Sequence, residues 1–160
     1  MFFPANLGQL YPGGDRHGNM RIKLLKFIGI ADAKGREIDA SALVTVLAEC
    51  FLVPAYALQS YLRWTDIDQT TAKAEIAYNN TKVSGIFYFN EAGEFVRFVS
   101  DDRYYTEKGR EYKKMRWSVY ADHYITRQGV RFPSLVKAVW HTSWGDYEYF
   151  RGKINNIIFS

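Results

Sequence analysis

The sequence predicts an α+β protein in which one strongly curved antiparallel β-sheet of about seven strands packs on one main helix. Alternating apolar residues follow one another from residue 71 to the end, with turn residues between the segments. A single segment, at residues 40–58, has apolar residues at helical spacing. Phe, Tyr and Trp make up 17% of the chain and supply large buried areas for such a sheet.

We expect one domain covering residues 1–160, because a chain of 160 residues buries a sizeable core without disulfides or metals. Hydrophobic residues reach 48%, which argues against disorder. Cys50 is the one cysteine and stands among apolar residues, which favours a small buried hydrophobe over a nucleophile. The chain shows neither a signal-peptide pattern nor an apolar run that could span a bilayer, so we expect a cytoplasmic protein.

The net charge is +4, and the basic residues are mostly spread singly. The densest cluster, at residues 108–116, also contains Glu111. Nucleic-acid binding needs a stripe of like charge with aromatic rings for stacking. Tyr112 and Trp117 lie near the cluster, but the pattern favours a charged hairpin loop, and no nucleic-acid partner is expected.

The first part of the chain predicts a loop, a strand and the helix. Residues 1–19 contain Pro and Gly punctuation typical of a loop, and residues 20–33 alternate as a strand does. Asp39 is expected to cap a helix that begins at about Ala40, and Pro54 to end it or to start a short second turn. The apolar residues from Leu43 to Phe51 form one face, with Thr45 and Glu49 on a stripe opposite.

Residues 64–160 are expected to form an antiparallel meander. Asn79-Asn80, Glu91-Ala92-Gly93, Arg127-Gln128-Gly129 and Gly145-Asp146 supply its turns. The strands are expected at residues 71–79, 82–90, 94–105, 112–126, 134–144 and 147–159. Several of them are apolar on both faces, so the second face is expected to be covered or to enclose a cavity.

The order of several motifs resembles an uncharacterised bacterial domain-of-unknown-function family. The motifs are Asp15-x-x-Gly18-x-Met20, LAECFLVPAYAL, RWTDID, FNEAGE, SDDRYY, YADHY, GVRFPS and YEYFRGKINNI. That family looks related to the LolA/LppX-like lipoprotein carriers, so the resemblance implies a half-barrel, a curved sheet that holds helices in its mouth. The family pattern has further strands before the Asp-x-x-Gly segment, so the chain is expected to be a short version or the C-terminal part of a larger half-barrel.

The resemblance places the family's helix glutamate at Glu49. A glutamate in an apolar mouth has a raised pKa and can act as a general acid or base. A solvated or Arg-paired Glu49, on the polar side of the helix, is the favoured alternative.

An Arg–Asp group is the second candidate. On a continuous strand Arg97, Asp101 and Arg103 share one face and Asp102 lies opposite. Guanidinium groups there could hold an anionic head group. Pairing among these residues, with Asp101 or Asp102 bound to an Arg of a neighbouring strand, is favoured over ligand binding.

Tryptophans are the third candidate, because Trp64, Trp117, Trp140 and Trp144 could line an apolar groove; packing in the core is the favoured alternative. His17, His123 and His141 show no paired-ligand spacing, and no nucleophile elbow, P-loop or dinucleotide fingerprint is present. We therefore expect no metal, no cofactor and no covalent chemistry.

The sequence thus favours a binding module without enzymatic activity, with an apolar or amphiphilic molecule in an aromatic groove between sheet and helix. The expected ligand-binding residues are Glu49, Trp64, Arg97, Asp102, Arg103, Trp117 and Trp140. The alternatives are a cofactor-free enzyme with Glu49 as general acid/base, and a purely structural or interaction domain. A homodimer is also expected, through an uncovered edge at residues 20–33.

Overall fold

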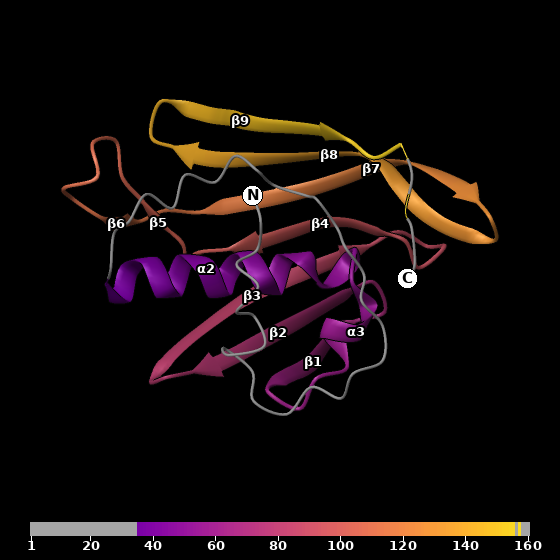
Figure 1. The fold of residues 1–160 in the computed structure, drawn as a ribbon, viewed down its shortest axis with the longest axis horizontal. Coiled ribbons are helices and arrows are strands. Elements are labelled where there is room, and N and C mark those ends of the chain that lie inside the picture. Colours follow the sequence, from indigo (N-terminus) through magenta and orange to yellow (C-terminus); the bar gives the residue numbers. More distant parts are fainter. Residues whose placement is uncertain (1–34, 156, 158–160) are drawn as a thin grey trace.

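A computed structural model describes residues 35–155 and residue 157 (Figure 1). The helical part comes first, as α2 (Arg36–Ala48), the 3-10 turn η1 (Glu49–Phe51) and the short helix α3 (Pro54–Ala57). The strands follow as β1 (Leu62–Asp68), β2 (Thr71–Tyr78), β3 (Thr81–Phe89), β4 (Phe95–Ser100), β5 (Tyr104–Tyr105), β6 (Lys113–Lys114), β7 (Trp117–Arg127), β8 (Val130–Thr142) and β9 (Gly145–Lys153). No helix in these described ranges has the length and apolar character that a bilayer crossing requires.

The main sheet has seven strands in the order β1-β2-β3-β4-β7-β8-β9, and each neighbouring pair is antiparallel. The sheet is open, with β1 and β9 at its two ends among the described strands. A separate hairpin of β5 and β6 projects between β4 and β7 (Figure 1). The antiparallel meander predicted from the sequence is confirmed.

Two of the predicted turns have the backbone that a tight hairpin needs. Asn79 and Asn80 adopt φ values of 45° and 61°, and Gln128 and Gly129 adopt 51° and 78°. Two consecutive residues with positive φ match the right-handed twist of the strands they join. Asparagine and glycine tolerate this conformation best, which explains why these turns were readable from the sequence.

The helix differs from the prediction at its start. It begins at Arg36 after Gly35, and Asp39 lies in its first turn rather than at its cap, with no side-chain capping bond. Glu37 and Asp39 place negative charge near the helix N-terminus, which favours an earlier start than the apolar pattern indicates. The expected polar stripe is also wrong, because Thr45 and Glu49 are both buried.

The strands differ from the prediction in several places. β8 begins at Val130 rather than at residue 134, and β9 spans Gly145–Lys153 rather than residues 147–159. β1 was not predicted as a strand, and the expected strand at residues 94–105 leaves the sheet after Ser100. β4 ends at Ser100 because the backbone N–H of Ser84 on β3 donates its hydrogen bond to the carboxylate of Asp102. This bond takes the place of the next backbone bond between the two strands. The expected strand at residues 112–126 is divided into β6, which pairs with β5, and β7, which rejoins the main sheet at Trp117. The strand predicted at residues 20–33 lies outside the described residues.

One face of the sheet, here called the inner face, carries α2. The helix contacts β2, β3 and β5, and it lies across the sheet in Figure 1. Side chains of both layers are completely or almost completely buried between them: Val44, Leu47, Ile76, Val83, Phe87, Phe98 and Trp117. Such burial of large apolar side chains is the main stabilising contribution to a domain of this size.

Gly85 on β3 makes this packing fit. A Cβ atom at this position would lie 2.2 Å from the ring of Phe98 on β4, and 3.0 Å from the carbonyl oxygen of Val99. The phenyl ring of Phe98 therefore occupies the space that a side chain would take. Glycine is required at this position because the Phe98 ring lies so close to the backbone of β3.

The opposite face, here called the outer face, carries Ile86, Tyr88, Arg97 and Val99, which are all partly exposed. Arg97 lies over the ring of Tyr88 at 4.1 Å. The expectation that both faces are apolar is met only in part, because the outer face mixes apolar with charged side chains.

Candidate functional site

Glu49 is enclosed where α2 ends against the sheet. Glu49 is only 7% exposed, and its Oε1 has no hydrogen-bond partner within the described part of the chain. Burial raises the pKa of Glu49 to about 8, and the positive charge of Arg103 opposes that rise. The solvated alternative weighed for this residue is therefore wrong, and the carboxyl is neutral below that pH.

Arg103 is buried in the same region, on the chain between Ser100 and β5. Its guanidinium lies 4.2 Å from the ring centre of Trp117 and 5.5 Å from that of Trp140. It donates hydrogen bonds to the hydroxyl of Thr45 and to the carbonyl oxygen of Ser41 on α2. Burial lowers the pKa of Arg103, while the charges of Tyr149 and Glu49 oppose that shift. The cation thereby joins the helix to the aromatic inner face.

The space beside Glu49 is small. A cavity of about 20 Å³ lies between Glu49, Phe51, Trp117 and Phe150. That volume accepts one water molecule, whereas pockets for small molecules measure about 300–1,000 Å³. Side chains therefore fill the interface between α2 and the sheet.

A larger hollow opens at the end of the helical segment, and we call it the aromatic groove. Its volume is about 350 Å³. Residues of η1 and α3 form one wall, and aromatic residues of the inner face form the other. The lining consists of Cys50, Phe51, Pro54, Ala57, Trp64, Phe87, Phe89, Gly93, Glu94, Phe95, Tyr124 and Arg131.

The rings of the groove are held in place by one another and by hydrogen bonds, one of which runs from the Tyr124 hydroxyl to the carbonyl oxygen of Phe95 at 2.8 Å. Phe51 stacks on Phe95 at 4.2 Å, and Trp64 meets Phe87 at 5.0 Å. Trp64 also donates its indole N–H to the carbonyl oxygen of Ala57 at 2.9 Å, which connects β1 to α3. The apolar walls are therefore already ordered without a ligand.

Glu94 and Arg131 give the groove one polar end. Arg131 Nε donates to Glu94 Oε1 at 2.5 Å, and Asn90 Nδ2 donates to Glu94 Oε2 at 2.9 Å. These hydrogen bonds hold the pKa of Glu94 below its usual range. The guanidinium of Arg131 also lies 5.6 Å from the ring centre of Tyr124. A single charged pair is thus positioned beside an apolar surface.

The structure divides the seven ligand-binding residues expected from the sequence into three places. Glu49, Arg103, Trp117 and Trp140 come together in the core beneath α2. Trp64 lines the aromatic groove. Arg97 and Asp102 line a different hollow, on the outer face.

The shared face expected for Arg97, Asp101 and Arg103 is wrong, because β4 ends before Asp101. Asp101 instead makes a two-pronged ion pair with Arg116, at 2.8 and 2.9 Å. The predicted pairing of Asp101 or Asp102 with an Arg is thus found, but Arg116 lies immediately before β7 and not on the neighbouring strand as expected. Asp102 pairs with Lys114 at 2.7 Å.

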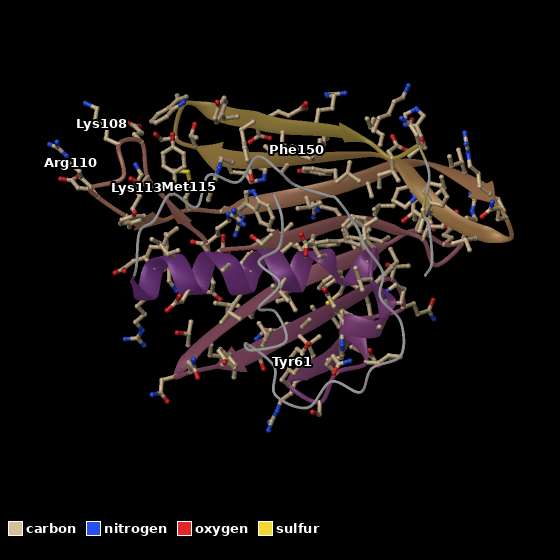
Figure 2. All side chains as sticks on the ribbon, in the orientation of Figure 1. Tyr61, Lys108, Arg110, Lys113, Met115 and Phe150 are labelled. Carbon is tan, nitrogen blue, oxygen red and sulfur yellow. The ribbon has the colours of Figure 1, made fainter. Side chains whose placement is uncertain are left out.

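The basic cluster at residues 108–116 belongs to the β5–β6 hairpin and the segment before β7, as the sequence indicated. Figure 2 shows Lys108 and Arg110 at the outer end of this hairpin, directed away from α2. In the part of the chain that the structure describes, no group of three or more His, Cys, Asp or Glu residues is placed to hold a metal ion.

Sequence reasoning missed most of the groove. Phe51, Phe89 and Phe95 were read as core residues or not singled out, and Arg131 lies on β8, far from them in sequence. The usable signal was FNEAGE, in which a turn brings Phe89 and Phe95 to adjacent strands with Glu94 between them.

Comparison with known proteins gives one match. A protein-family model described as "Family of unknown function (DUF6544)" matches residues 10–152. No curated protein and no solved structure matches the chain.

Proposed function

The chain belongs to the DUF6544 family of unknown function, and we propose that it binds a small amphiphilic molecule in the aromatic groove. The observation that supports this proposal is the combination of an open, ring-lined hollow with one charged pair at its end. Ligand sites are typically concave, mostly apolar and furnished with few polar groups that fix orientation.

The dimensions of the groove support a small ligand. Its volume of about 350 Å³ lies at the lower end of the range for small-molecule pockets. Trp64 is 37% exposed although it is one of the largest apolar side chains of the inner face. A bound apolar chain would cover this indole and the neighbouring rings, and burial of that surface would drive binding.

Arg131 supports an anionic end on the ligand. A guanidinium has five N–H donors, and in the described residues only Nε is engaged, by Glu94. The side chain is 53% exposed, so both terminal nitrogens can reach a ligand. A carboxylate is the simplest partner for these two parallel donors. The proposed ligand is therefore a molecule with an apolar chain and a carboxylate.

The architecture supports a carrier of apolar molecules. An open antiparallel sheet with helices against one face agrees with the half-barrel that the resemblance to LolA-like carriers implies. We also propose that the chain has the half-barrel fold of those carriers, and a crystal structure of the whole chain would test this.

Glu49 is the second candidate, as a general acid or base, and its raised pKa of about 8 favours this role. Phe51 lines both the small cavity beside Glu49 and the aromatic groove, so this role would require the ring to leave its stacked position on Phe95. The carboxyl would then face the bound ligand.

Isothermal titration calorimetry with decanoate and with 1-decanol tests the proposed binding. We expect decanoate to bind more tightly than 1-decanol, and Trp64→Ala to weaken both. Trp144→Ala is the matched control, because Trp144 is 69% exposed and does not line the groove. Equal binding by wild type and Trp64→Ala would contradict the proposal.

Arg131→Gln tests the polar end separately. The variant should weaken the binding of decanoate by about tenfold, which corresponds to about 1.4 kcal/mol, and leave the binding of 1-decanol unchanged. An equal loss for both molecules would show that Arg131 supports the groove rather than the carboxylate. The absence of any binding by either molecule would contradict the proposal as a whole.

A further inference from the structure

A hydrogen-bonded chain of hydroxyl, imidazole and carboxylate crosses three strands on the outer face. Ser118 Oγ lies 2.8 Å from His141 Nε2, and His141 Nδ1 lies 2.7 Å from Asp146 Oδ1. This is the order in which a serine hydroxyl is activated by an imidazole that a carboxylate orients. Ser118 and His141 are 23 positions apart in the sequence, and His141 and Asp146 are 5 apart, so the fold brings the three side chains together.

The strand ladder fixes the position of each member. Ser118 on β7 pairs with Val139 on β8, and His141 lies two residues further along the same face of β8. His141 pairs directly with Asp146 on β9, next to the turn at Gly145. The hydroxyl of Thr142 closes that turn by donating to the carbonyl oxygen of Gly145 at 2.6 Å. Residues held by paired strands are positioned more precisely than residues on loops.

Solvent exposure increases along this hydrogen-bonded series, from the hydroxyl of Ser118 to the carboxylate of Asp146. Ser118 is 1% exposed, whereas the side chains of His141 and Asp146 are 24% and 66% exposed. A buried hydroxyl needs one hydrogen-bond partner, which His141 supplies. That need does not account for the second bond, in which Asp146 orients the imidazole from the solvent side.

Ser118 and His141 line a hollow of about 420 Å³ on the outer face. Ile86, Tyr88 and Val99 supply its apolar part. Its lining also carries the cations Lys73, Arg97 and Arg116 and the carboxylates Asp101 and Asp102. Arg116 is paired with Asp101, and Lys73 with Glu75. Arg97 makes no ion pair within the described ranges, although its guanidinium is ordered over Tyr88. The hollow thus offers room for a small molecule and a cation that no carboxylate neutralises.

We propose that Ser118, His141 and Asp146 form a hydrolytic site for esters of short acyl chains. Ser118 Oγ attacks the ester carbonyl carbon while its proton passes to His141 Nε2. The carbon–alkoxide bond then breaks, and His141 returns the proton to the leaving alkoxide. Water attacks the acyl-serine, gives a proton to His141, and Ser118 leaves as the proton is returned to it. The products are one carboxylic acid and one alcohol.

Arg97 supplies the electrostatic part of the mechanism, because Lys73 and Arg116 are already paired with carboxylates. Backbone N–H groups in the centre of a sheet are engaged in the ladder, so they are poor donors for an oxyanion. Arg97 lines the same hollow as Ser118 and provides charge for the negative oxygen that forms during attack. The site lies on the face opposite the aromatic groove, so it stands independently of the proposed ligand binding.

Covalent labelling tests the proposal directly. The folded protein is exposed to diisopropyl fluorophosphate, which loses fluoride when a serine oxygen attacks phosphorus, and the modified peptide is identified by mass spectrometry. We expect label on Ser118, its loss in Ser118→Ala, and a fall of at least tenfold in labelling rate in His141→Gln. Ser134→Ala is the control, because Ser134 is a β8 serine outside the hollow whose hydroxyl is bound to a backbone carbonyl oxygen, and the labelling of this variant should equal that of wild type.

Hydrolysis of p-nitrophenyl acetate gives the second measurement. Asp146→Asn changes an exposed side chain and so should leave the melting temperature unchanged. It should lower kcat by about 100-fold or more at constant KM, because the amide cannot orient the imidazole as the carboxylate does. Absence of label on Ser118, or equal labelling rates in wild type and His141→Gln, would overturn the proposal. Unchanged kcat in Asp146→Asn would do the same.

Discussion

The guanidinium of Arg103 lies 4.2 Å from the ring centre of Trp117 inside the core, and it donates a hydrogen bond of 3.4 Å to the carbonyl oxygen of Ser41. Together with its bond to the Thr45 hydroxyl, this contact joins α2 to the sheet through a buried cation. A cation removed from water is costly unless all of its neighbours favour it. Arg103 is therefore a buried polar link between α2 and the sheet.

Replacing Arg103 with Ala should destabilise the fold by about 2–5 kcal/mol, because it leaves a cavity beside two indoles and removes the hydrogen bonds to Thr45 and Ser41. Urea denaturation followed by tryptophan fluorescence measures the change. Arg97→Ala is the matched control, since Arg97 lies partly exposed over Tyr88 and should contribute about 1 kcal/mol or less. Equal denaturation midpoints for wild type and Arg103→Ala would contradict this role.

The stability of the protein should fall as the pH rises through neutrality. Burial raises the pKa of folded Glu49 from its usual 4.5 to about 8, so between these values the folded chain keeps a proton that the unfolded chain has lost. The contribution of Glu49 to the free energy of unfolding is complete below pH 4.5, and it is lost as the pH passes about 8. In between, the free energy of unfolding should fall by about 1.4 kcal/mol per pH unit.

Glu49→Gln removes this titration, and urea midpoints measured from about pH 5 to about pH 9 should become nearly independent of pH. Glu148→Gln is the control, because the ion pair with Arg151 holds the pKa of Glu148 below its usual range, outside this window. That variant should keep the slope of the wild type. The same slope in Glu49→Gln would show that another group causes it.

Gly85→Ala should destabilise the fold by about 1–3 kcal/mol, because its methyl group meets the Phe98 ring. Phe98→Leu in the same chain should recover part of that loss, since leucine leaves the space that the methyl group needs. A double-mutant cycle of thermal melts measures the coupling between the two sites. Additive effects would show that Phe98 is not the residue in contact.

The segment at residues 20–33 leads us to expect self-association, although it lies outside the described residues. Its alternating apolar pattern resembles an edge strand, and unpaired strand edges recruit further strands. Light scattering across a dilution series should show a dimer that dissociates at low concentration. A constant monomer mass would contradict the expectation.

The sequence predicted the elements whose signals are local. Asn79-Asn80 and Gln128-Gly129 identify their turns because the positive φ values that they adopt are unfavourable for most residues. The alternation of large apolar residues identified the strands of the meander. The helix was recognised by its spacing but not by its first turn, where Arg36 and Glu37 show no apolar periodicity.

Features that depend on distant contacts were not predictable. The end of β4 is set by a hydrogen bond between Ser84 and Asp102, which are 18 residues apart. The burial of Glu49 depends on Trp117 and Phe150, which complete the wall around it from β7 and β9. His141 was dismissed because its sequence neighbours show no ligand spacing, whereas its partners come from the strands on either side.

The order of strands in the main sheet has a consequence for how the chain folds. Every strand pairs with its predecessor in the chain, except that β7 joins β4 after the β5–β6 excursion. Hairpins between successive strands close short loops, so little chain entropy is lost before the first contacts form. Formation of the sheet should thus proceed by zipping from hairpins on either side, with the union of β4 and β7 as the slowest pairing. The topology predicts faster folding than in a Greek-key sandwich of the same length.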